Sequence, residues 1–230
     1  MENYGYIKNN YDSLIEEIKV LSDRLGVCAP TLVSVTKSGS DEELIALMRA
    51  GAAHIGENRP GEVLRRYELL RSLGFAPLMH EIGTLQRNKI KLVAGCAHMI
   101  HSVDSEKLAS GISRLSLECG RRIPVLIEVN SAREEQKSGV MPEEVEPLLN
   151  KIYSMPGIIP SGLMTMGPVC DDPEKLRPYF RLTKKLFDKL QDEYGFGSDP
   201  VLSMGMSDSY RVAIEEGSTL VRVGRRLFVK

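Results

Sequence analysis

The sequence predicts an α/β fold, a (β/α)₈ TIM-like barrel preceded by one N-terminal helix. Strand-like and helix-like runs alternate from end to end of the 230 residues. Such alternation is typical of parallel strands joined by right-handed crossovers, and the chain has room for eight such units. No low-complexity linker interrupts the pattern, so we expect residues 1–230 to form a single domain. An open doubly wound sheet is the competing architecture.

The predicted strands are short apolar runs, most of which end in polar or small residues. They cover residues 31–37, 54–58, 78–83, 99–103, 124–130, 158–166, 201–204 and 219–224. In a barrel of this kind, the functional site lies at the C-terminal ends of the strands. Candidate functional residues are therefore expected at those ends.

The predicted helices carry recognisable start and stop signals. Apolar residues at helical spacing between Tyr11 and Leu25 predict the N-terminal helix. Ser40 and Glu43 form a capping box, and Gly51 ends the helix that follows. Further helix starts are expected at Asp104 or Ser105, at Pro142 and at Pro173, and a short helix ends at Gly217.

Composition excludes several classes of protein. The net charge of −1 offers no general attraction to nucleic acid. No apolar stretch is long enough to cross a membrane, and the N-terminus lacks the features of a signal peptide. The four cysteines show no C-x-x-C spacing. We expect a cytoplasmic protein with reduced thiols and no metal site.

The last two predicted strands end in residues suited to a phosphate group. The seventh ends in S-M-G-M-S, from Ser203 to Ser207, and the eighth ends at Gly224. Hydroxyls, free backbone N–H groups and a helix N-terminus together favour the binding of a phosphate group. Barrels of this type commonly bind phosphate in the loops after strands seven and eight.

Lys37 ends the first predicted strand, and these loops follow the last two. A strand-end lysine often packs its stem on apolar neighbours and extends its ammonium group into water. Beside a phosphate site, however, its amine is a candidate for attack on an aldehyde. Lysine and phosphate site together suggest pyridoxal 5′-phosphate (PLP) held as a Schiff base.

Arg222 alternates with Val221 and Val223, so its side chain is predicted to point away from theirs. One interpretation of Arg222 is an arginine that pairs with a carboxylate at the barrel mouth. Here it is also a candidate partner of the pyridine nitrogen of PLP. Because arginine only donates hydrogen bonds, the ring nitrogen would stay unprotonated and the ring would be a weak electron sink.

Two further patterns are weaker. His98 and His101 form H-x-x-H, but strand alternation predicts that they point to opposite faces, so a metal pair is not expected. Lys137, in a polar loop after the fifth strand, is a candidate second lysine whose side chain could reach the pocket.

Ordered motifs along almost the whole chain carry a resemblance to a known family. They are V-S-V-T-K ending at Lys37, I-G-E-N at 55–58, M-H-E-I-G-T-L-Q-R-N-K at 79–89, V-L-I-E-V-N at 125–130, Q-K-S-G at 136–139, G-L-M-T-M at 162–166, S-M-G-M-S-D at 203–208 and G-S-T-L-V-R-V-G at 217–224. The chain resembles the YggS-like (PROSC) pyridoxal-phosphate homeostasis proteins, whose barrel is related to the N-terminal domain of alanine racemase.

The resemblance implies a role for particular residues. Lys37 would form the Schiff base, Arg222 would face the pyridine nitrogen, and Asn58 would lie near the ring. The residues implied to hold the phosphate are Ser203, Ser207, Gly224 and Arg225. The chain departs from the family pattern at the pocket rim, in Arg59, Met79 and Glu81.

The resemblance implies a PLP-binding protein of vitamin B6 and amino-acid homeostasis without robust turnover. PLP-dependent apo-enzymes are candidate partners, and the protein is expected to be a monomer or a weak homodimer. Two enzyme alternatives remain open. One is a stand-alone PLP-dependent amino-acid racemase, for which the strand ends opposite Lys37 supply only Asn130, Met164 and Met166. The other is a Schiff-base aldolase-type barrel without a cofactor.

Overall fold

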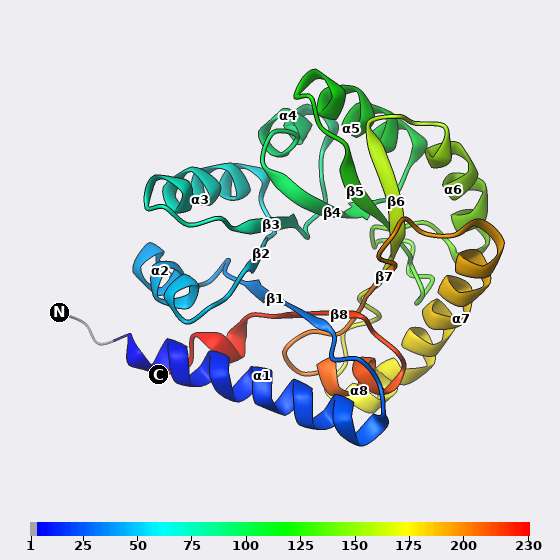
Figure 1. Ribbon diagram of the computed structural model, residues 1–230. Coiled ribbons are helices and arrows are strands. Elements are labelled where there is room, and N and C mark those ends of the chain that lie inside the picture. Colours follow the sequence, from blue (N-terminus) through cyan, green and yellow to red (C-terminus); the bar gives the residue numbers. More distant parts are fainter. Residues whose placement is uncertain (1–3) are drawn as a thin grey trace.

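The computed structural model describes residues 4–230, and its eight parallel strands close into a barrel in sequence order. Strand β1 pairs with both β2 and β8, which completes the ring (Figure 1). The predicted TIM-like barrel is therefore confirmed, and the open sheet is excluded. The strands are β1 (Thr31–Val35), β2 (His54–Glu57), β3 (Leu78–Glu81), β4 (Ala97–Val103), β5 (Ile123–Glu128), β6 (Ile158–Met164), β7 (Val201–Ser203) and β8 (Leu220–Val223).

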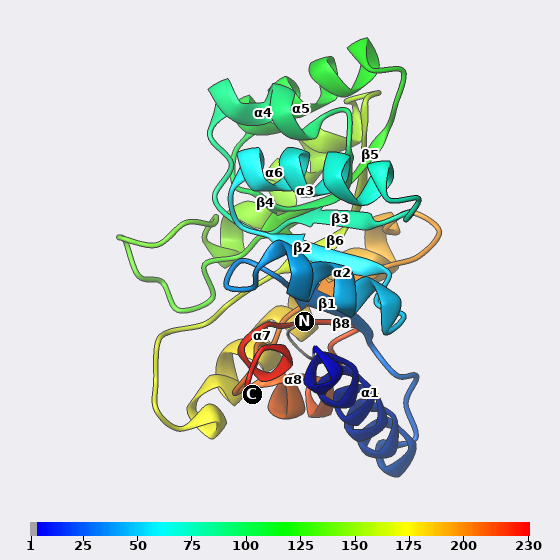
Figure 2. The same cartoon turned by 90° about the vertical axis from the view of Figure 1, so that its left-hand side faces the viewer.

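Helices surround the barrel, and the predicted N-terminal helix α1 is present (Figures 1 and 2). They are α1 (Gly5–Leu25), α2 (Asp41–Arg49), α3 (Pro60–Ser72), α4 (Ile90–Val93), α5 (Glu106–Glu118), α6 (Val145–Tyr153), α7 (Arg177–Tyr194) and α8 (Tyr210–Glu215), with 3₁₀ turns η1 (Arg87–Lys89), η2 (Pro142–Glu144), η3 (Pro173–Leu176) and η4 (Arg225–Leu227). None of the helices within residues 4–230 has the length and apolar character needed to span a membrane.

Most of the expected helix signals act as predicted. Ser40 and Glu43 form the capping box of α2, and Gly51 follows with the positive φ that favours glycine. Helix α3 lies outside the helices expected above. It begins with Pro60 at its first turn, where the missing N–H costs nothing.

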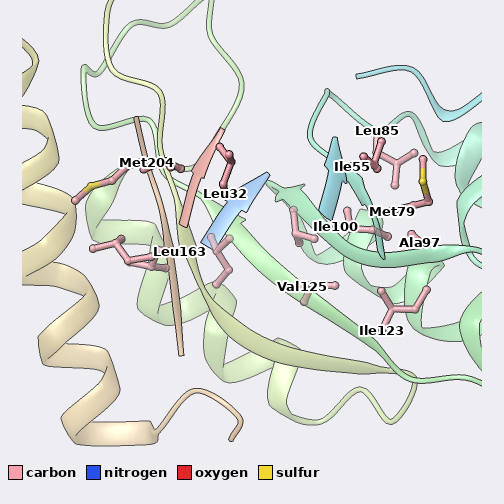
Figure 3. Close-up of a cluster of buried hydrophobic side chains, with 14 of the residues drawn as sticks. Leu32, Ile55, Met79, Leu85, Ala97, Ile100, Ile123, Val125, Leu163 and Met204 are labelled. Carbon is pink, nitrogen blue, oxygen red and sulfur yellow. The ribbon is translucent and has the colours of Figure 1, made fainter. Parts of the chain in front are cut away.

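Two apolar cores stabilise the barrel. The larger fills the layer between strands and helices, and Figure 3 shows part of it, including Ile55, Met79 and Ile100. The smaller contains only strand residues, each from a different strand, so it fills the interior of the barrel; its members are Val33, Met99, Leu126, Met164, Val201 and Leu220. Side chains that alternate with the outer core therefore point into the barrel, and this places the polar residues discussed next.

Candidate functional site

Lys37 lies at the C-terminal mouth of the barrel, in the turn that follows β1. Its side chain is exposed. The turn is closed by the N–H of Gly39, which donates to the carbonyl of Thr36 over 2.9 Å. An amine in a defined turn at the barrel mouth is available to a ligand bound there.

A buried arginine from α3 holds this turn in place. Arg66 donates from Nη1 to the carbonyl oxygen of Thr36 and from Nη2 to that of Gly39, each over 2.7 Å. Its Nη1 also lies 2.9 Å from Oε1 of Glu57, and both side chains are almost fully buried. Hydrogen bonds from Arg66 therefore hold the Lys37 turn, and Glu57 holds Arg66 through an ion pair that the sequence patterns did not reveal.

Arg222 points into the barrel, as predicted, because Val221 and Val223 belong to the outer core. Its guanidinium donates from Nη1 to Oγ of Ser203 and from Nη2 to the carbonyl oxygen of Thr165, the latter over 3.1 Å. Burial lowers the pKa of Arg222 to about 10, so it stays charged at neutral pH. It is a fixed positive donor below the mouth.

The two loops expected to bind phosphate, one after β7 and one after β8, contact each other. The N–H of Gly224 donates to Oγ of Ser207 over 3.2 Å. A Cβ on Gly224 would lie 2.9 Å from the carbonyl oxygen of Val35, so a side chain has no room there. Arg225 is exposed beside them and forms an ion pair with Asp208. The Ser207 hydroxyl proton and the N–H groups of Arg225 that do not pair with Asp208 can donate to an anion, so this donor set fits a phosphate group.

Ser203 differs from the position expected for it. It is fully buried, and its hydroxyl lies between the guanidinium of Arg222 and Nδ1 of His101, the latter 3.1 Å away. A hydroxyl engaged by two buried nitrogens below the mouth supports Arg222, whereas Ser207 is the hydroxyl beside Gly224. The structure thus places the Ser203 hydroxyl against Arg222 and His101, whereas its predicted contact with a phosphate stays a prediction.

Asn58 follows β2 directly, and its side chain is exposed at the mouth. A Cβ on Gly83 would collide with the Asn58 backbone, so the loops after β2 and β3 approach closely only because residue 83 is glycine. Of the three rim departures, only Arg59 is exposed beside Asn58. Met79 is fully buried in the outer core, away from the mouth.

Glu81 is the third departure, and it is a buried carboxylate. Its Oε1 accepts the N–H of Gly83 over 2.9 Å, while its Oε2 is buried without a hydrogen-bond partner. Burial raises the pKa of Glu81 to about 8. The carboxyl is therefore protonated over much of the physiological range, which removes the cost of an unpaired buried charge.

A pocket of about 260 Å³ opens beyond the ends of β5 and β6. Its lining includes Glu128, Asn130, Lys137 and Met166. Lys137 reaches this pocket, as the sequence suggested, but its ammonium group donates to Oε1 of Glu134 over 2.8 Å. Because that amine is already paired, it is the poorer candidate for covalent chemistry.

Glu128 is a titratable residue that the sequence analysis missed. It is 5% exposed, and burial, with a smaller effect of Asp104, raises its pKa to about 7, while Arg222 opposes the rise. The expectation that this side of the mouth supplies no acid or base is therefore wrong. The available signal was a glutamate inside the apolar run V-L-I-E-V.

The chain has four histidines, and all of them meet inside the barrel. Nδ1 of His54 lies 2.9 Å from Nε2 of His80, and Nδ1 of His80 lies 2.9 Å from Nε2 of His101. Since His101 contacts Ser203, a continuous line of polar contacts runs from His54 to Arg222. Burial lowers the pKa of every one of these imidazoles.

The prediction that His98 and His101 point to opposite faces is wrong. The pairing of β3 with β4 shifts by one residue: Met79 pairs with Ala97, but His80 pairs with Met99. His98 is the extra residue of this bulge, which breaks the alternation of the strand. Both His98 and His101 therefore place their rings against that of His80, with centroids 5.4 Å and 5.1 Å away.

The chain is similar to proteins of known family. The model of the alanine racemase N-terminal domain family matches residues 10–229. A protein of Aquifex aeolicus called pyridoxal phosphate homeostasis protein is 40% identical, over 94% of each chain. One of the same name from Helicobacter pylori is 37% identical, over 86% of each chain.

Solved structures agree with these relatives. PipY of Synechococcus elongatus with PLP bound is 27% identical, with a TM-score of 0.83 over 97% of this chain and 100% of that one. A Clostridium difficile alanine racemase, 17% identical, shares the fold over 56% of its own length with a TM-score of 0.74. This chain therefore belongs to the alanine racemase N-terminal domain family and, within it, to the pyridoxal phosphate homeostasis proteins.

Proposed function

We propose that this protein binds PLP at the mouth of the barrel, as a Schiff base on Lys37, and serves PLP homeostasis without robust catalytic turnover. The observation that carries the proposal is the arrangement of three features: the Lys37 turn, the Ser207–Gly224 loops and the buried Arg222. The names of the relatives and the PLP-bound structure of PipY support it.

Each residue has a separate task in this proposal. PLP supplies an aldehyde and an electron-withdrawing ring. Ser207, Gly224 and Arg225 would hold its phosphate, and Lys37 would provide the amine for the aldehyde. Asn58 would lie beside the ring. Arg222, held by Ser203 and Thr165, would donate to the pyridine nitrogen.

The charge of Arg222 is the reason to expect binding without turnover. A permanent donor keeps the ring nitrogen unprotonated, because it has no proton to release at neutral pH. The ring then stabilises negative charge at the substrate carbon poorly. Storage of PLP and delivery to apo-enzymes need only reversible binding, which this site allows. We take the protein to act in the cytoplasm, as one domain over residues 1–230 and as a monomer or weak homodimer.

Glu128 favours one alternative, the stand-alone amino-acid racemase. A racemase needs an acid and a base on opposite faces of the cofactor, each with a pKa near the working pH. Glu128, with a pKa of about 7 at the pocket beyond β5, is the described residue that best fits the second group. The aldolase-type barrel requires no cofactor, so PLP binding itself separates it from both other functions.

Titration of the cofactor-free protein with PLP and with pyridoxal tests the binding proposal. We expect a visible absorption band with PLP and at least tenfold weaker binding of pyridoxal, since pyridoxal lacks the phosphate. Equal affinities would contradict the phosphate site. Absence of any band would favour the aldolase-type barrel.

A chirality assay tests the absence of turnover. The PLP-loaded protein is incubated with single enantiomers of alanine and serine, and the enantiomeric composition is followed. We expect no loss of enantiomeric purity at about one turnover per second or faster. Racemisation at such a rate, abolished by Glu128→Gln, would establish the racemase alternative.

A further inference from the structure

The histidine cluster lies at the end of the barrel opposite to the mouth. His54 is the first residue of β2, and His98 is the second residue of β4. His80 lies between them on β3, and its ring is within 5.2 Å and 5.4 Å of theirs, measured between centroids. Nothing in the proposed PLP chemistry uses His54 or His98.

We propose that His54, His80 and His98 form a binding site for a divalent transition metal of the zinc class. One ring nitrogen of each lies within 4.8 Å of those of the other two. Zinc binds imidazole nitrogen at about 2.0–2.1 Å in tetrahedral geometry, which separates two ligand nitrogens by roughly 3.3 Å. Side-chain rotations that change these separations by about 1.5 Å or less would bring the three nitrogens to that spacing.

The surroundings of the three rings suit this role. His54 and His98 are half-buried, whereas His80 is almost fully buried. Two ligands therefore border solvent, so an ion has a path to the site and water can occupy the fourth position. Among residues 4–230, His98 contacts His54 and His80 through its ring but has no hydrogen-bond partner. Its lone pair is free for an ion.

His101 supplies the outer contact that metal-binding histidines usually have. A metal-bound histidine commonly donates its other ring N–H to a neighbouring acceptor, which fixes its tautomer. With Nε2 of His80 on the metal, its Nδ1–H would donate to Nε2 of His101 over the observed 2.9 Å. His101 would in turn donate from Nδ1 to Ser203.

The metal would thereby set the direction of the contacts that lead to Arg222. Without metal, the opposite direction is also satisfied: Ser203 donates to His101, His101 to His80, and His80 to His54. A metal removes this option because it occupies the lone pairs of both His54 and His80. Occupancy at one end of the barrel then fixes the tautomers below the arginine at the other end.

Cobalt and zinc binding to PLP-free protein tests this site independently of the proposed function. The protein is treated with a chelator and titrated with Co²⁺, and Zn²⁺ is then added as a competitor. We expect one Co²⁺ per chain with the intense absorption of tetrahedral coordination, displaced by Zn²⁺. Wild-type protein without this absorption at saturating Co²⁺ would overturn the proposal.

Variants assign the ligands. His54→Ala and His98→Ala should abolish the tetrahedral spectrum, whereas His101→Asn, which keeps all three ligands, should retain it with roughly 10–100-fold weaker binding. Cys28→Ser with Cys119→Ser, which removes exposed thiols, should change nothing. Circular dichroism checks folding, and His98→Gln replaces any alanine variant that unfolds. A spectrum that survives in the folded His54 and His98 variants, or that is lost with the cysteines, would contradict the assignment.

Discussion

The two ends of the barrel interior carry opposite kinds of polar chemistry. At the mouth, Lys37, Arg222 and buried carboxylates such as Glu128 are ionisable groups around a proposed anionic ligand. At the other end, His54 and His98 are kept neutral by burial. One barrel interior thus holds charged groups at its mouth and neutral ring nitrogens at its far end, and a line of polar contacts from His54 to Arg222 joins the two.

The largest expected effect comes from removing the ion pair under the mouth. Arg66→Ala removes the only arginine that pairs with the buried Glu57 among residues 4–230, leaves it the hydroxyl of Thr36, and frees the turn of Lys37. Loss of one member of a buried pair costs about 3–5 kcal/mol. We expect chemical denaturation to show a loss of that size, together with weaker PLP binding.

Arg65→Ala is the matched control for this variant. Arg65 is the neighbouring arginine on the same helix and pairs with Asp41 and Glu62, but all three side chains are at least one-third exposed. Exposed pairs contribute about 0.2–1 kcal/mol. Equal losses for Arg65→Ala and Arg66→Ala would show that the buried pair does not hold the mouth.

The pH dependence of stability should differ in sign between the two ends. The pKa of Glu128 is raised to about 7 in the folded state, so its contribution is present below pH 4.5 and lost as the pH rises towards 7. Each tenfold change in proton affinity corresponds to about 1.4 kcal/mol, so the shift from 4.5 to about 7 predicts that Glu128→Gln gains roughly 3 kcal/mol relative to wild type at pH 8 and little at pH 4.5. Denaturation of the PLP-free proteins at both pH values measures this difference.

The histidines should act in the opposite direction. Their pKa values are lowered in the folded state, so their contribution is present above pH 6.5 and lost as the pH falls through the folded values. A Glu128→Gln variant should therefore retain the loss of stability on the acid side. If the stability of Glu128→Gln no longer fell at low pH, the groups at the two ends would not titrate separately.

Within the mouth, the phosphate loops and the arginine support should respond differently. Ser207→Ala removes a hydroxyl beside Gly224 and should weaken PLP about ten- to hundredfold, without affecting pyridoxal. Ser203→Ala removes a contact of Arg222, so it should weaken both ligands by the same factor. Calorimetric titration with both ligands distinguishes the two serines. A phosphate-specific loss in Ser203→Ala would restore it to the phosphate loops.

The smallest effect is expected from a substitution at the far end. His98 lies outside the line of contacts from His54 to Arg222. In metal-free protein, His98→Ala should therefore leave PLP affinity within about threefold of wild type, a difference of at most about 0.7 kcal/mol. A tenfold change would mean that the two ends are not separate sites.

The fold could be predicted because each of its signals is local. The alternation of strand-like and helix-like apolar patterns, the Ser40–Glu43 capping box and the glycines that end helices can each be recognised from residues close together in the sequence. Lys37 and Arg222 could likewise be placed, since strand ends and strand alternation fixed their side of the barrel. Local patterns were sufficient wherever the strands stayed regular.

The remaining features depend on contacts between distant strands. The bulge at His98 is a property of the β3–β4 pairing, and no single-strand pattern reveals it. Ser203, the last residue of β7, and Ser207, in the loop that follows, both carry hydroxyls, and only the packing of Ser203 against Arg222 and His101 distinguishes them. The altered pKa of Glu128 arises from burial among strands that are far apart in sequence.

The most direct test of the PLP site is to identify the lysine that holds the cofactor. The PLP-loaded protein is reduced with borohydride, digested and analysed by mass spectrometry, with Lys37→Ala in parallel. We predict one modified peptide containing Lys37, and no reduced adduct in Lys37→Ala, which should still bind some PLP through its phosphate contacts. Modification at Lys137 or Lys89 with Lys37 unlabelled would contradict the account.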